Sequence, residues 1–142
     1  MMDRRDFVTR CACALSAVAL AGCASLVIRR VTPIEGRLEL ALSHFPELSE
    51  RESSLAVLPD GYDDPIYVLT DSTGAFTALS SACTHLGCTV EVESSRLVCP
   101  CHGSTFDRAG KVLRGPAESS LVRYTTKLSS DGVLIIDLAR RA

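Results

Sequence analysis

The sequence predicts a small all-β domain behind an N-terminal targeting segment. Short apolar runs, separated by turn-forming residues, recur along the chain from residue 31 onwards. No segment keeps the apolar period of an amphipathic helix over several turns. A further apolar run, residues 11–28, follows a basic stretch near the start and has the composition of a targeting segment.

Length and charge narrow the class of protein. The chain has 142 residues, of which 46% are hydrophobic, so it is long enough for one domain and too short for two ordinary ones. It carries 15 basic and 17 acidic residues, a formal net charge of −2. This balance gives no attraction to phosphate backbones, and we therefore expect no nucleic-acid partner.

Residues 1–28 resemble a twin-arginine export signal. The stretch DRRDFV has paired arginines, Arg4 and Arg5, then a spacer and two hydrophobic residues. Asp3 departs from the pattern, which usually has Ser or Thr before the arginines. The alternative is an ordinary secretory signal whose basic region contains Arg-Arg. Twin-arginine export carries folded proteins, so it suits a protein that acquires a cofactor in the cytoplasm.

The apolar run also contains a candidate lipobox. Residues 20–23, LAGC, resemble a lipoprotein processing site at which Cys23 would be lipidated and become the mature N-terminus. The alternative is an uncleaved anchor helix, for which residues 11–28 are at the short end of the roughly 17–25 residues that span a bilayer. Either alternative places the domain outside the cytoplasm and ties it to a membrane, with residues 29–37 as the tether.

The body of the protein, residues 38–140, reads as a series of strands. In its first run, leucines at every second position alternate with more polar residues, the period of a half-buried strand. Turn-forming stretches, PDG and DSTG, separate the next runs, and SSDG separates the last two, which predict a hairpin. The predicted strands are residues 38–42, 54–58, 66–70, 76–80, 121–128 and 133–138.

Between these strands lies a window rich in cysteine and histidine. It contains CTHLGC at residues 83–88 and CPCHGSTF at residues 99–106. Residues 90–92 and 96–98 predict a hairpin that turns at residues 94–95. Because a hairpin brings its two ends together, we expect the two groups of side chains to meet in space.

The spacing C-x-H-x₂-C, ten residues, C-x-C-H-G-S resembles the cluster-binding motif of the Rieske iron–sulfur proteins. The resemblance covers roughly residues 38–138. It implies a fold of small antiparallel sheets with a cluster-binding subdomain inserted as two loops. It also implies one [2Fe–2S] cluster, with Cys83 and Cys99 on one iron and His85 and His102 on the other.

This mixed ligand set has an electrostatic consequence. Four thiolates leave an oxidised cluster with two negative charges, whereas two thiolates and two neutral imidazoles leave it neutral. Accepting an electron is then easier, and such centres have potentials of about −150 to +300 mV, against about −400 mV for plant-type ferredoxins.

Two cysteines remain, and the resemblance implies that Cys88 and Cys101 form a disulfide between the two loops. A disulfide suits an exported protein, and one that closes a loop of this length contributes on the order of 3 kcal/mol. Cytoplasmic Rieske ferredoxins and oxygenases usually lack this pair, so its presence indicates the high-potential, quinol-oxidising branch. The alternative is two free thiols.

The resemblance gives roles to two further side chains near the cluster. In the high-potential branch, the serine at the position of Ser104 donates a hydrogen bond to a bridging sulfide. A tyrosine usually stands at the position of Phe106 and donates to a ligand cysteine sulfur. One donor is therefore missing, and we predict a potential below that of the Tyr-containing members. Simple packing is the alternative role for Phe106.

Three glycine and proline positions complete the predicted site. We expect Gly87 and Gly103 to let the backbone approach the sulfurs and donate N–H bonds to them. The stretch GPA, residues 115–117, resembles the loop whose proline, here Pro116, covers the third side of the cluster. An ordinary turn is the alternative for this stretch. The remaining histidine, His44, has no partner motif and is excluded as a ligand.

Two sites without iron are alternatives. Two cysteines and two histidines also satisfy tetrahedral zinc, but zinc ligands are typically spaced C-x₂₋₄-C and H-x₃₋₅-H. Here each loop supplies one of each, with a cysteine pair left over. A plain disulfide scaffold leaves the histidines beside both cysteine groups unexplained.

The resemblance implies a one-electron carrier that depends on partners. His85 and His102 should lie at an exposed tip, where an imidazole accepts a hydrogen bond from a quinol or other electron donor and takes up its proton. A cytochrome or an oxidoreductase subunit would then accept the electron. The candidates are the Rieske subunit of a quinol:cytochrome c oxidoreductase, the small Rieske subunit of another exported oxidoreductase such as an arsenite-oxidase-like enzyme, and a Rieske ferredoxin. The export signal and the cysteine pair disfavour the last.

Overall fold

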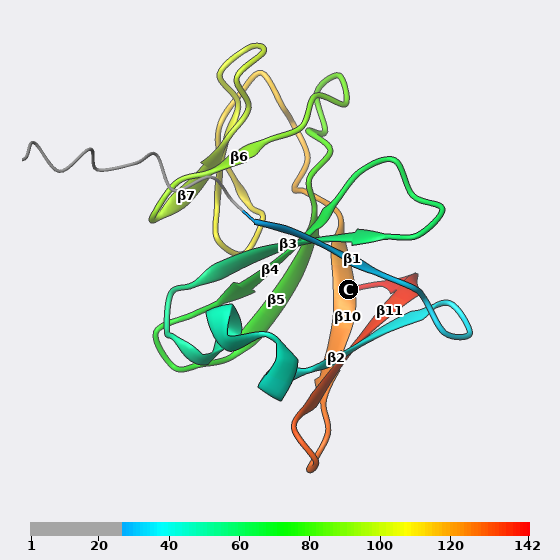
Figure 1. The fold of residues 1–142 in the computed structure, drawn as a ribbon. Coiled ribbons are helices and arrows are strands. Elements are labelled where there is room, and N and C mark those ends of the chain that lie inside the picture. The colour runs from blue at the N-terminus through cyan, green and yellow to red at the C-terminus, as the bar shows by residue number, and fades with distance from the viewer. Residues whose placement is uncertain (1–26) are drawn as a thin grey trace, which may run out of the picture.

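The computed structural model describes residues 27–142, which form two β-sheets (Figure 1). The predicted lipidation site at Cys23 and nearly all of the predicted export signal lie outside the described residues. The strands are β1 (Ile28–Val31), β2 (Arg37–Ala41), β3 (Ser54–Pro59), β4 (Ile66–Thr70), β5 (Phe76–Ser80), β6 (Glu91–Val92), β7 (Arg96–Val98), β8 (Thr105–Asp107), β9 (Val112–Arg114), β10 (Arg123–Leu128) and β11 (Val133–Arg141). Two 3₁₀ segments, η2 (Leu42–His44) and η3 (Pro46–Ser49), follow β2. Residues 27–142 contain no helix with the length and apolar character that crossing a bilayer requires.

The larger sheet, called the base sheet below, has seven strands in the order β1-β3-β4-β5-β10-β11-β2. Its neighbouring strands are antiparallel, except that β1 runs parallel to β3. The smaller sheet, β6-β7-β8-β9, is antiparallel throughout and stands above the base sheet in Figure 1. It belongs to residues 81–122, called the inserted subdomain below, because the chain leaves the base sheet after β5 and returns to it at β10. The predicted all-β fold is thus confirmed.

The centre of the base sheet is buried on both faces. All five positions of β4 are buried, as expected for an apolar run without polar alternation. One face of β3, β4 and β5 packs against β2 and β11. On the other face, Tyr67, Leu69 and Leu79 pack against apolar residues of the inserted subdomain, among them Leu97 and Phe106. The inserted subdomain therefore rests on an apolar face of the base sheet.

One glycine shows how closely the two parts approach. Gly110, in the turn between β8 and β9, has a φ of +87°, and a Cβ there would lie 2.9 Å from Cδ2 of Leu79. The turn consequently packs directly onto β5, and a larger residue at this position would be both strained and too close.

The N-terminal strand differs from the sequence expectation. The predicted tether of residues 29–37 begins inside β1, whose residues pair with Ala56–Pro59 of β3. The adjacent arginines hide any strand period, and pairing with the exposed edge of β3 is a tertiary contact that the local sequence does not reveal.

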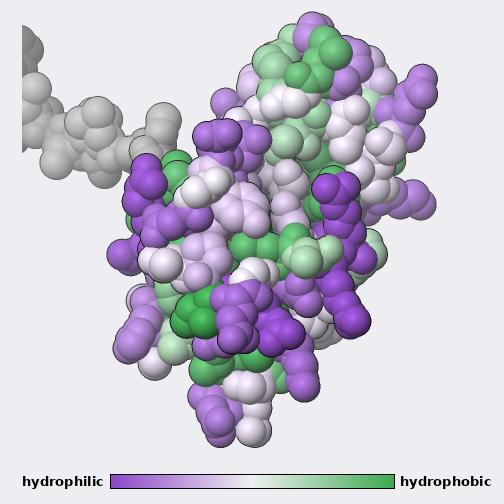
Figure 2. Space-filling model, turned by 90° about the vertical axis from the view of Figure 1, so that its right-hand side faces the viewer, coloured by the Kyte–Doolittle hydropathy of each residue, from purple (hydrophilic) through white to green (hydrophobic). Residues whose placement is uncertain are grey.

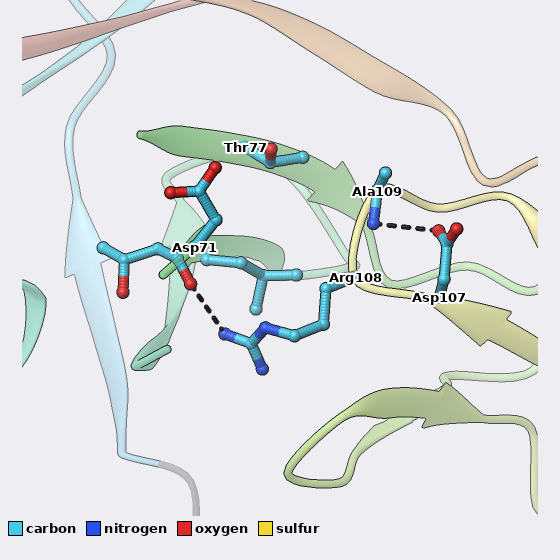
Figure 3. Close-up of a pocket in the computed structure, with 7 residues that line it drawn as sticks. Asp71, Thr77, Asp107, Arg108 and Ala109 are labelled. Atoms are coloured by element: carbon cyan, nitrogen blue, oxygen red, sulfur yellow. Dashed lines mark hydrogen bonds between the residues drawn. The ribbon is translucent and has the colours of Figure 1, made fainter. Parts of the chain in front are cut away.

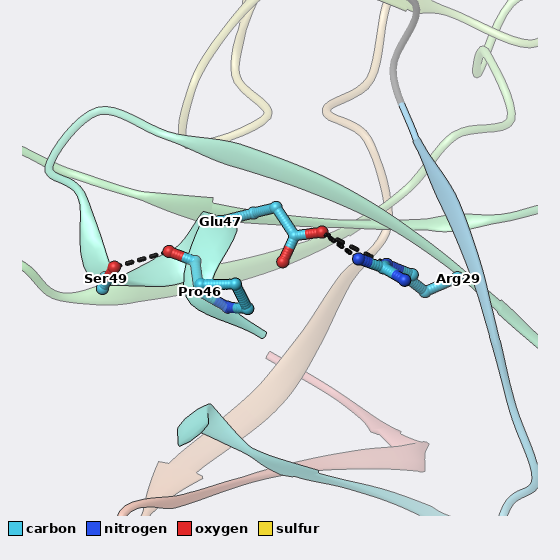
Figure 4. A network of polar contacts seen from close by, with 4 residues as sticks. All are labelled: Arg29, Pro46, Glu47 and Ser49. Atoms are coloured by element: carbon cyan, nitrogen blue, oxygen red, sulfur yellow. Dashed lines mark hydrogen bonds and ion pairs between the residues drawn. The ribbon is translucent and has the colours of Figure 1, made fainter. Parts of the chain in front are cut away.

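Side chains also hold β1 in place (Figure 4). Arg29 forms an ion pair with Glu47 of η3, with an Nη2–Oε1 distance of 2.6 Å. Hydrogen bonding to Arg29 lowers the pKa of the Glu47 carboxyl from its ordinary value. Farther along, Thr32 donates a hydrogen bond to Asp60 at 2.6 Å. The ion pair is largely exposed, so most of the stability of β1 comes from its backbone pairing.

Candidate metal centre

Two loops of the inserted subdomain carry the predicted ligand side chains. The first loop, residues 83–88, follows β5 and is flanked by an isolated bridge between Ala82 and Thr89. The second loop, residues 99–106, connects β7 to β8 and enters that strand at Thr105. The hairpin predicted between the loops is present as β6 and β7, and it brings the two loops together as expected.

The two loops close in the same way. In the first loop, the N–H of Cys83 donates to the carbonyl oxygen of Cys88 at 2.8 Å. In the second, the N–H of Cys99 donates to the carbonyl oxygen of Ser104 at the same distance. Each loop is thus a tight turn that begins at a cysteine and presents its middle residues outward.

The glycines play a different part from the one predicted. Gly87 and Gly103 have φ values of +81° and +77°, in the left-handed region that glycine adopts without strain. Their N–H groups donate to the carbonyl oxygens of Cys83 and Cys99, at 2.8 and 2.9 Å, and not to the sulfurs. A Cβ at either glycine would meet nothing within 4 Å. The left-handed turn conformation therefore requires glycine at both positions.

The four cysteines divide into a bonded pair and a free pair. Cys88 and Cys101 form a disulfide, with an S–S distance of 2.05 Å and 6.5 Å between their Cα atoms. This is the disulfide that the resemblance implied, and it joins the two loops. Cys83 and Cys99 are free and buried. The Cys99 sulfur lies within 4.8 Å of both disulfide sulfurs, but these are already bonded, so only the free pair can bind a metal.

The two histidines lie side by side at the ends of the loops. The ring centroids of His85 and His102 are 4.9 Å apart, and the rings meet edge to face at 88°. His102 is exposed and His85 is half-buried. Nδ1 of His85 is buried and has no hydrogen-bond partner among residues 27–142. A buried nitrogen without a partner is costly unless something else binds it.

The free cysteines lie in surroundings that resist negative charge. Burial raises the pKa of the Cys83 thiol above its ordinary value, and the neighbouring Cys99 raises it further. Hydrogen bonds from the backbone N–H of His85 and the hydroxyl of Ser104 act in the opposite direction. Metal ligation needs the thiolate, and a bound cation stabilises it. Two such cysteines and an unpartnered imidazole nitrogen are a donor set that fits iron with mixed sulfur and nitrogen ligation.

The segment around Pro116 covers one side of the loops. The hydroxyl of Ser104, which is fully buried, accepts a hydrogen bond from the N–H of Ala117 at 2.9 Å. Thr84 in the first loop donates to the carbonyl oxygen of Ser119 at 2.6 Å. Pro116 itself lines a shallow hollow beside His85. The segment is therefore bonded to both loops, as a covering segment requires.

Two other predicted positions have clear locations. Phe106 is fully buried in the core between the inserted subdomain and the base sheet, so it packs there whatever its effect on the cluster. His44 is exposed in η2, next to the base sheet and outside both loops.

The sequence interpretation missed several residues that support the site. Tyr67 of β4 donates its hydroxyl to the carbonyl oxygen of Val90, at 2.6 Å, just beyond the first loop. A tyrosine within an otherwise apolar strand is a signal for such a bond, because a buried hydroxyl needs a partner. Thr84, Glu118 and Ser119, which line the hollow with His85 and Pro116, gave no comparable signal.

The comparison with protein families agrees with this geometry. A model described as the Rieske [2Fe-2S] domain matches residues 44–125. The chain belongs to the Rieske [2Fe–2S] family. It therefore carries one [2Fe–2S] cluster, and the donor set of the two loops fits that cofactor.

Named relatives of this Rieske chain include the cytochrome b6-f complex iron-sulfur subunit of Nostoc punctiforme, which is 43% identical over 76 residues. That match covers 51% of this chain and 42% of the relative. The corresponding subunit of a Prochlorococcus marinus strain is also 43% identical, over 43% of its length. The Rieske chain thus spans less than half the length of these curated relatives.

Solved structures give the same picture. The cyanobacterial plasma membrane Rieske protein PetC3 from Synechocystis PCC 6803 is 35% identical, with a TM-score of 0.50 over 58% of this chain and 84% of that one. A chain from a complex of oxygenase and ferredoxin in carbazole 1,9a-dioxygenase has a TM-score of 0.56 at 18% identity, over 73% of this chain and 95% of that one. The second likeness shows the shared fold alone.

Proposed function

We propose that this Rieske protein is an exported, membrane-tethered carrier of single electrons. It accepts electrons from a quinol-type donor and passes them to a redox partner such as a cytochrome. Two similarities support the proposal: the matched relatives are iron-sulfur subunits of cytochrome b6-f complexes, and a matched structure is a plasma membrane Rieske protein. The disulfide between the loops favours this branch over a cytoplasmic ferredoxin.

We assign Cys83 and Cys99 to one iron and His85 and His102 to the other. One observation carries the assignment. Two buried free cysteines lie in disulfide-linked loops that also hold two histidine rings with centroids 4.9 Å apart. Each loop contributes one sulfur and one nitrogen, so both loops are needed for binding.

When bound, the cluster supplies a centre that takes up and returns one electron. The histidines supply the contact with the donor, since an outward-facing imidazole nitrogen of His102 or His85 accepts a hydrogen bond from a quinol hydroxyl and takes up its proton. The buried cysteines keep their sulfurs away from water. Ser104 acts to lower the pKa of the Cys83 thiol, which means that its hydroxyl stabilises negative charge on that sulfur.

An exposed apolar residue beside the histidines suits docking to a partner. Leu86, next to His85, is 70% exposed. In Figure 2, hydrophobic residues reach the surface at the upper end of the molecule, while hydrophilic residues cover much of the base below. A protein partner that covers this end would exclude water from the imidazoles.

Reduction kinetics test this function. The oxidised full-length protein, purified in detergent, should be reduced by a soluble short-chain quinol. The His44→Gln variant should be reduced at the same rate as the parent, because this histidine lies outside the loops. If reduced ferredoxin donors transferred electrons to the protein and quinols did not, the result would instead indicate a ferredoxin role. A colourless protein containing zinc would contradict the assignment.

We further propose residues 1–28 as the targeting segment and residues 38–140 as the Rieske domain, with its cluster loops at 83–88 and 99–106. Arg4→Lys with Arg5→Lys should keep the protein on the cytoplasmic side if export follows the twin-arginine route. If the lipobox is used, the parent protein should take up a lipid label and Cys23→Ala should abolish it; if an anchor helix is retained, the parent protein should carry no such label. Co-purification of a cytochrome or of a molybdopterin enzyme separates the two exported partner classes.

A further inference from the structure

The inserted subdomain and the base sheet meet mainly through apolar contacts. Leu97 and Phe106 on one side face Tyr67, Leu69 and Leu79 on the other. Apolar burial holds such surfaces together but is not directional. It therefore leaves open how the subdomain, with its two histidines, is kept in one orientation above the base sheet.

Polar contacts join the same two parts on opposite sides of this core. One is the hydrogen bond from Tyr67 to Val90, close to the first loop. Another involves Thr70, at the far end of β4 and three residues along the strand. At a rise of about 3.3 Å per residue, the two positions are about 10 Å apart. Two separated directional contacts fix an orientation that one contact would leave free to rotate.

The contact at Thr70 is made by Arg108, which follows β8 directly (Figure 3). Its Nη2 donates to the carbonyl oxygen of Thr70 at 3.2 Å and also to that of Ser53, which precedes β3. Its Nη1 donates to the carbonyl oxygen of Ser94, in the β6–β7 turn, at 3.1 Å. One side chain thus ties two turns of the inserted subdomain to the adjacent ends of two base strands.

The surroundings of Arg108 favour this bracing role over a role as a charged ligand site. The nearby carboxylates of Asp71 and Asp107 accept hydrogen bonds from N–H groups of their own turns, including that of Ala109. Neither of the ion pairs found within residues 27–142 includes Arg108. Nη1 and Nη2 of its guanidinium donate to three backbone carbonyls, whereas Nε is buried without a partner among residues 27–142. A planar group with several fixed donors is suited to such a junction.

On the base sheet, the residues that accept hydrogen bonds from Arg108 are held by hydrogen bonds of their own. Thr70 is buried, and its hydroxyl donates to the carbonyl oxygen of Glu50 at 2.8 Å and accepts from the N–H of Ser53 at 2.8 Å. The N–H of Thr70 donates to the carbonyl oxygen of Ser53 at 3.2 Å. Arg108 therefore anchors the subdomain to a rigid point of the base sheet.

We propose that Arg108 is a positioning residue, which holds the cluster-bearing subdomain in a fixed orientation on the base sheet and so sets where the paired histidines face. The inference rests on the cluster site proposed above, but the hydrogen bonds of Arg108 go to Ser94, Ser53 and Thr70 and not to the ligand residues. Its loss should change the position of the histidine tip relative to the base and not the chemistry at the tip.

The test is the distance between the reduced cluster and a nitroxide on the base sheet, measured by pulsed EPR on the full-length protein. A ketone-bearing unnatural residue at the exposed position of Lys127 in β10 carries the label and leaves the cysteines untouched. The distance distribution of the parent protein should be narrow. In Arg108→Met it should broaden or shift, and in Arg108→Lys, which keeps the charge and one donor group, it should be intermediate.

Arg96→Met is the matched control, because Arg96 bonds to Glu93 within its own turn at 2.6 Å and does not reach the base. Its distribution should equal that of the parent. An Arg108→Met distribution that superimposes on the parent, or an equal broadening in Arg96→Met, would overturn the inference. Should Arg108→Met lose its cluster, the comparison of Arg108→Lys with the parent decides in the same way.

Hydrogen exchange gives a second readout that does not need the cluster. The amide of Thr70, which bonds to Ser53, should exchange on the order of tenfold faster in Arg108→Met than in the parent. Unchanged exchange would refute the bracing role. If the parent protein gave no cluster signal but the Thr70 amide still exchanged faster in Arg108→Met than in the parent, the proposed function would be refuted and the positioning role would stand.

Discussion

Replacing Ser104 by alanine tests how the chain stabilises charge at the cluster. The hydroxyl is fully buried, accepts a hydrogen bond from the N–H of Ala117 at 2.9 Å, and acts to lower the pKa of the neighbouring Cys83 thiol. The substitution removes one donor from the sulfur side of the site and leaves one backbone N–H without its partner. It should therefore affect both the redox potential and the stability.

The size of each effect follows from the bond that is lost. A hydrogen bond to a charged group contributes about 1.5–3 kcal/mol, and for a one-electron couple about 1.4 kcal/mol corresponds to about 59 mV. If the bond acts mainly on the reduced state, the midpoint potential should fall by about 60–130 mV. The buried N–H of Ala117 without a partner should lower the free energy of unfolding by about 1–3 kcal/mol.

A redox titration followed by EPR measures the first effect, and thermal unfolding measures the second. Ser120→Ala is the matched control, because Ser120 is exposed and lies close to Ala117 in the sequence. This substitution should change neither the midpoint potential nor the free energy of unfolding. A midpoint potential that stays at the parent value in Ser104→Ala would refute the donor role. An equal fall in Ser120→Ala would do the same.

Three further substitutions follow from the same geometry. Phe106→Tyr should raise the midpoint potential by supplying the missing donor, and a redox titration that shows no rise would contradict that role. Removing the disulfide with Cys88→Ala and Cys101→Ala, which are 13 residues apart, should lower the free energy of unfolding by about 3 kcal/mol, as measured by denaturant titration; equal stability would argue against it. Tyr67→Phe leaves the carbonyl of Val90 without its donor and should lower the free energy of unfolding by about 1–3 kcal/mol. Burial raises the pKa of Tyr67. The contribution of Tyr67 to the free energy of unfolding is therefore complete below pH about 10 and declines as the pH rises through the folded-state pKa. In Tyr67→Phe the pH dependence of unfolding should flatten in that range, and an unchanged profile would contradict this role of the tyrosine.

The strands of the base were predictable because their signals are local. The runs at Ile66–Thr70 and Phe76–Ser80 coincide with β4 and β5 as the structure has them. The three-residue strands β8 and β9 were missed, since runs this short carry no clear period. Strand β1 was taken for a tether because its partner, β3, lies more than twenty residues away in the sequence.

The candidate site was predictable in its residues but not in its bonding. The spacing of cysteines and histidines indicated which side chains would meet, and the structure brings them together. The spacing did not reveal that the N–H groups of Gly87 and Gly103 close the loops on carbonyl oxygens. The hydrogen bonds of Arg108 go to carbonyls far away in the sequence, and no local sequence pattern predicts such contacts.

Nitrogen coupling to the reduced centre tests the assignment most directly. In protein whose histidines carry ¹⁵N, electron–nuclear double resonance should detect two histidine nitrogens bound at the paramagnetic iron pair, and His44→Gln should keep both. A spectrum without any histidine nitrogen, or a parent-like spectrum after replacement of His85 or His102, would contradict mixed ligation by the two loops.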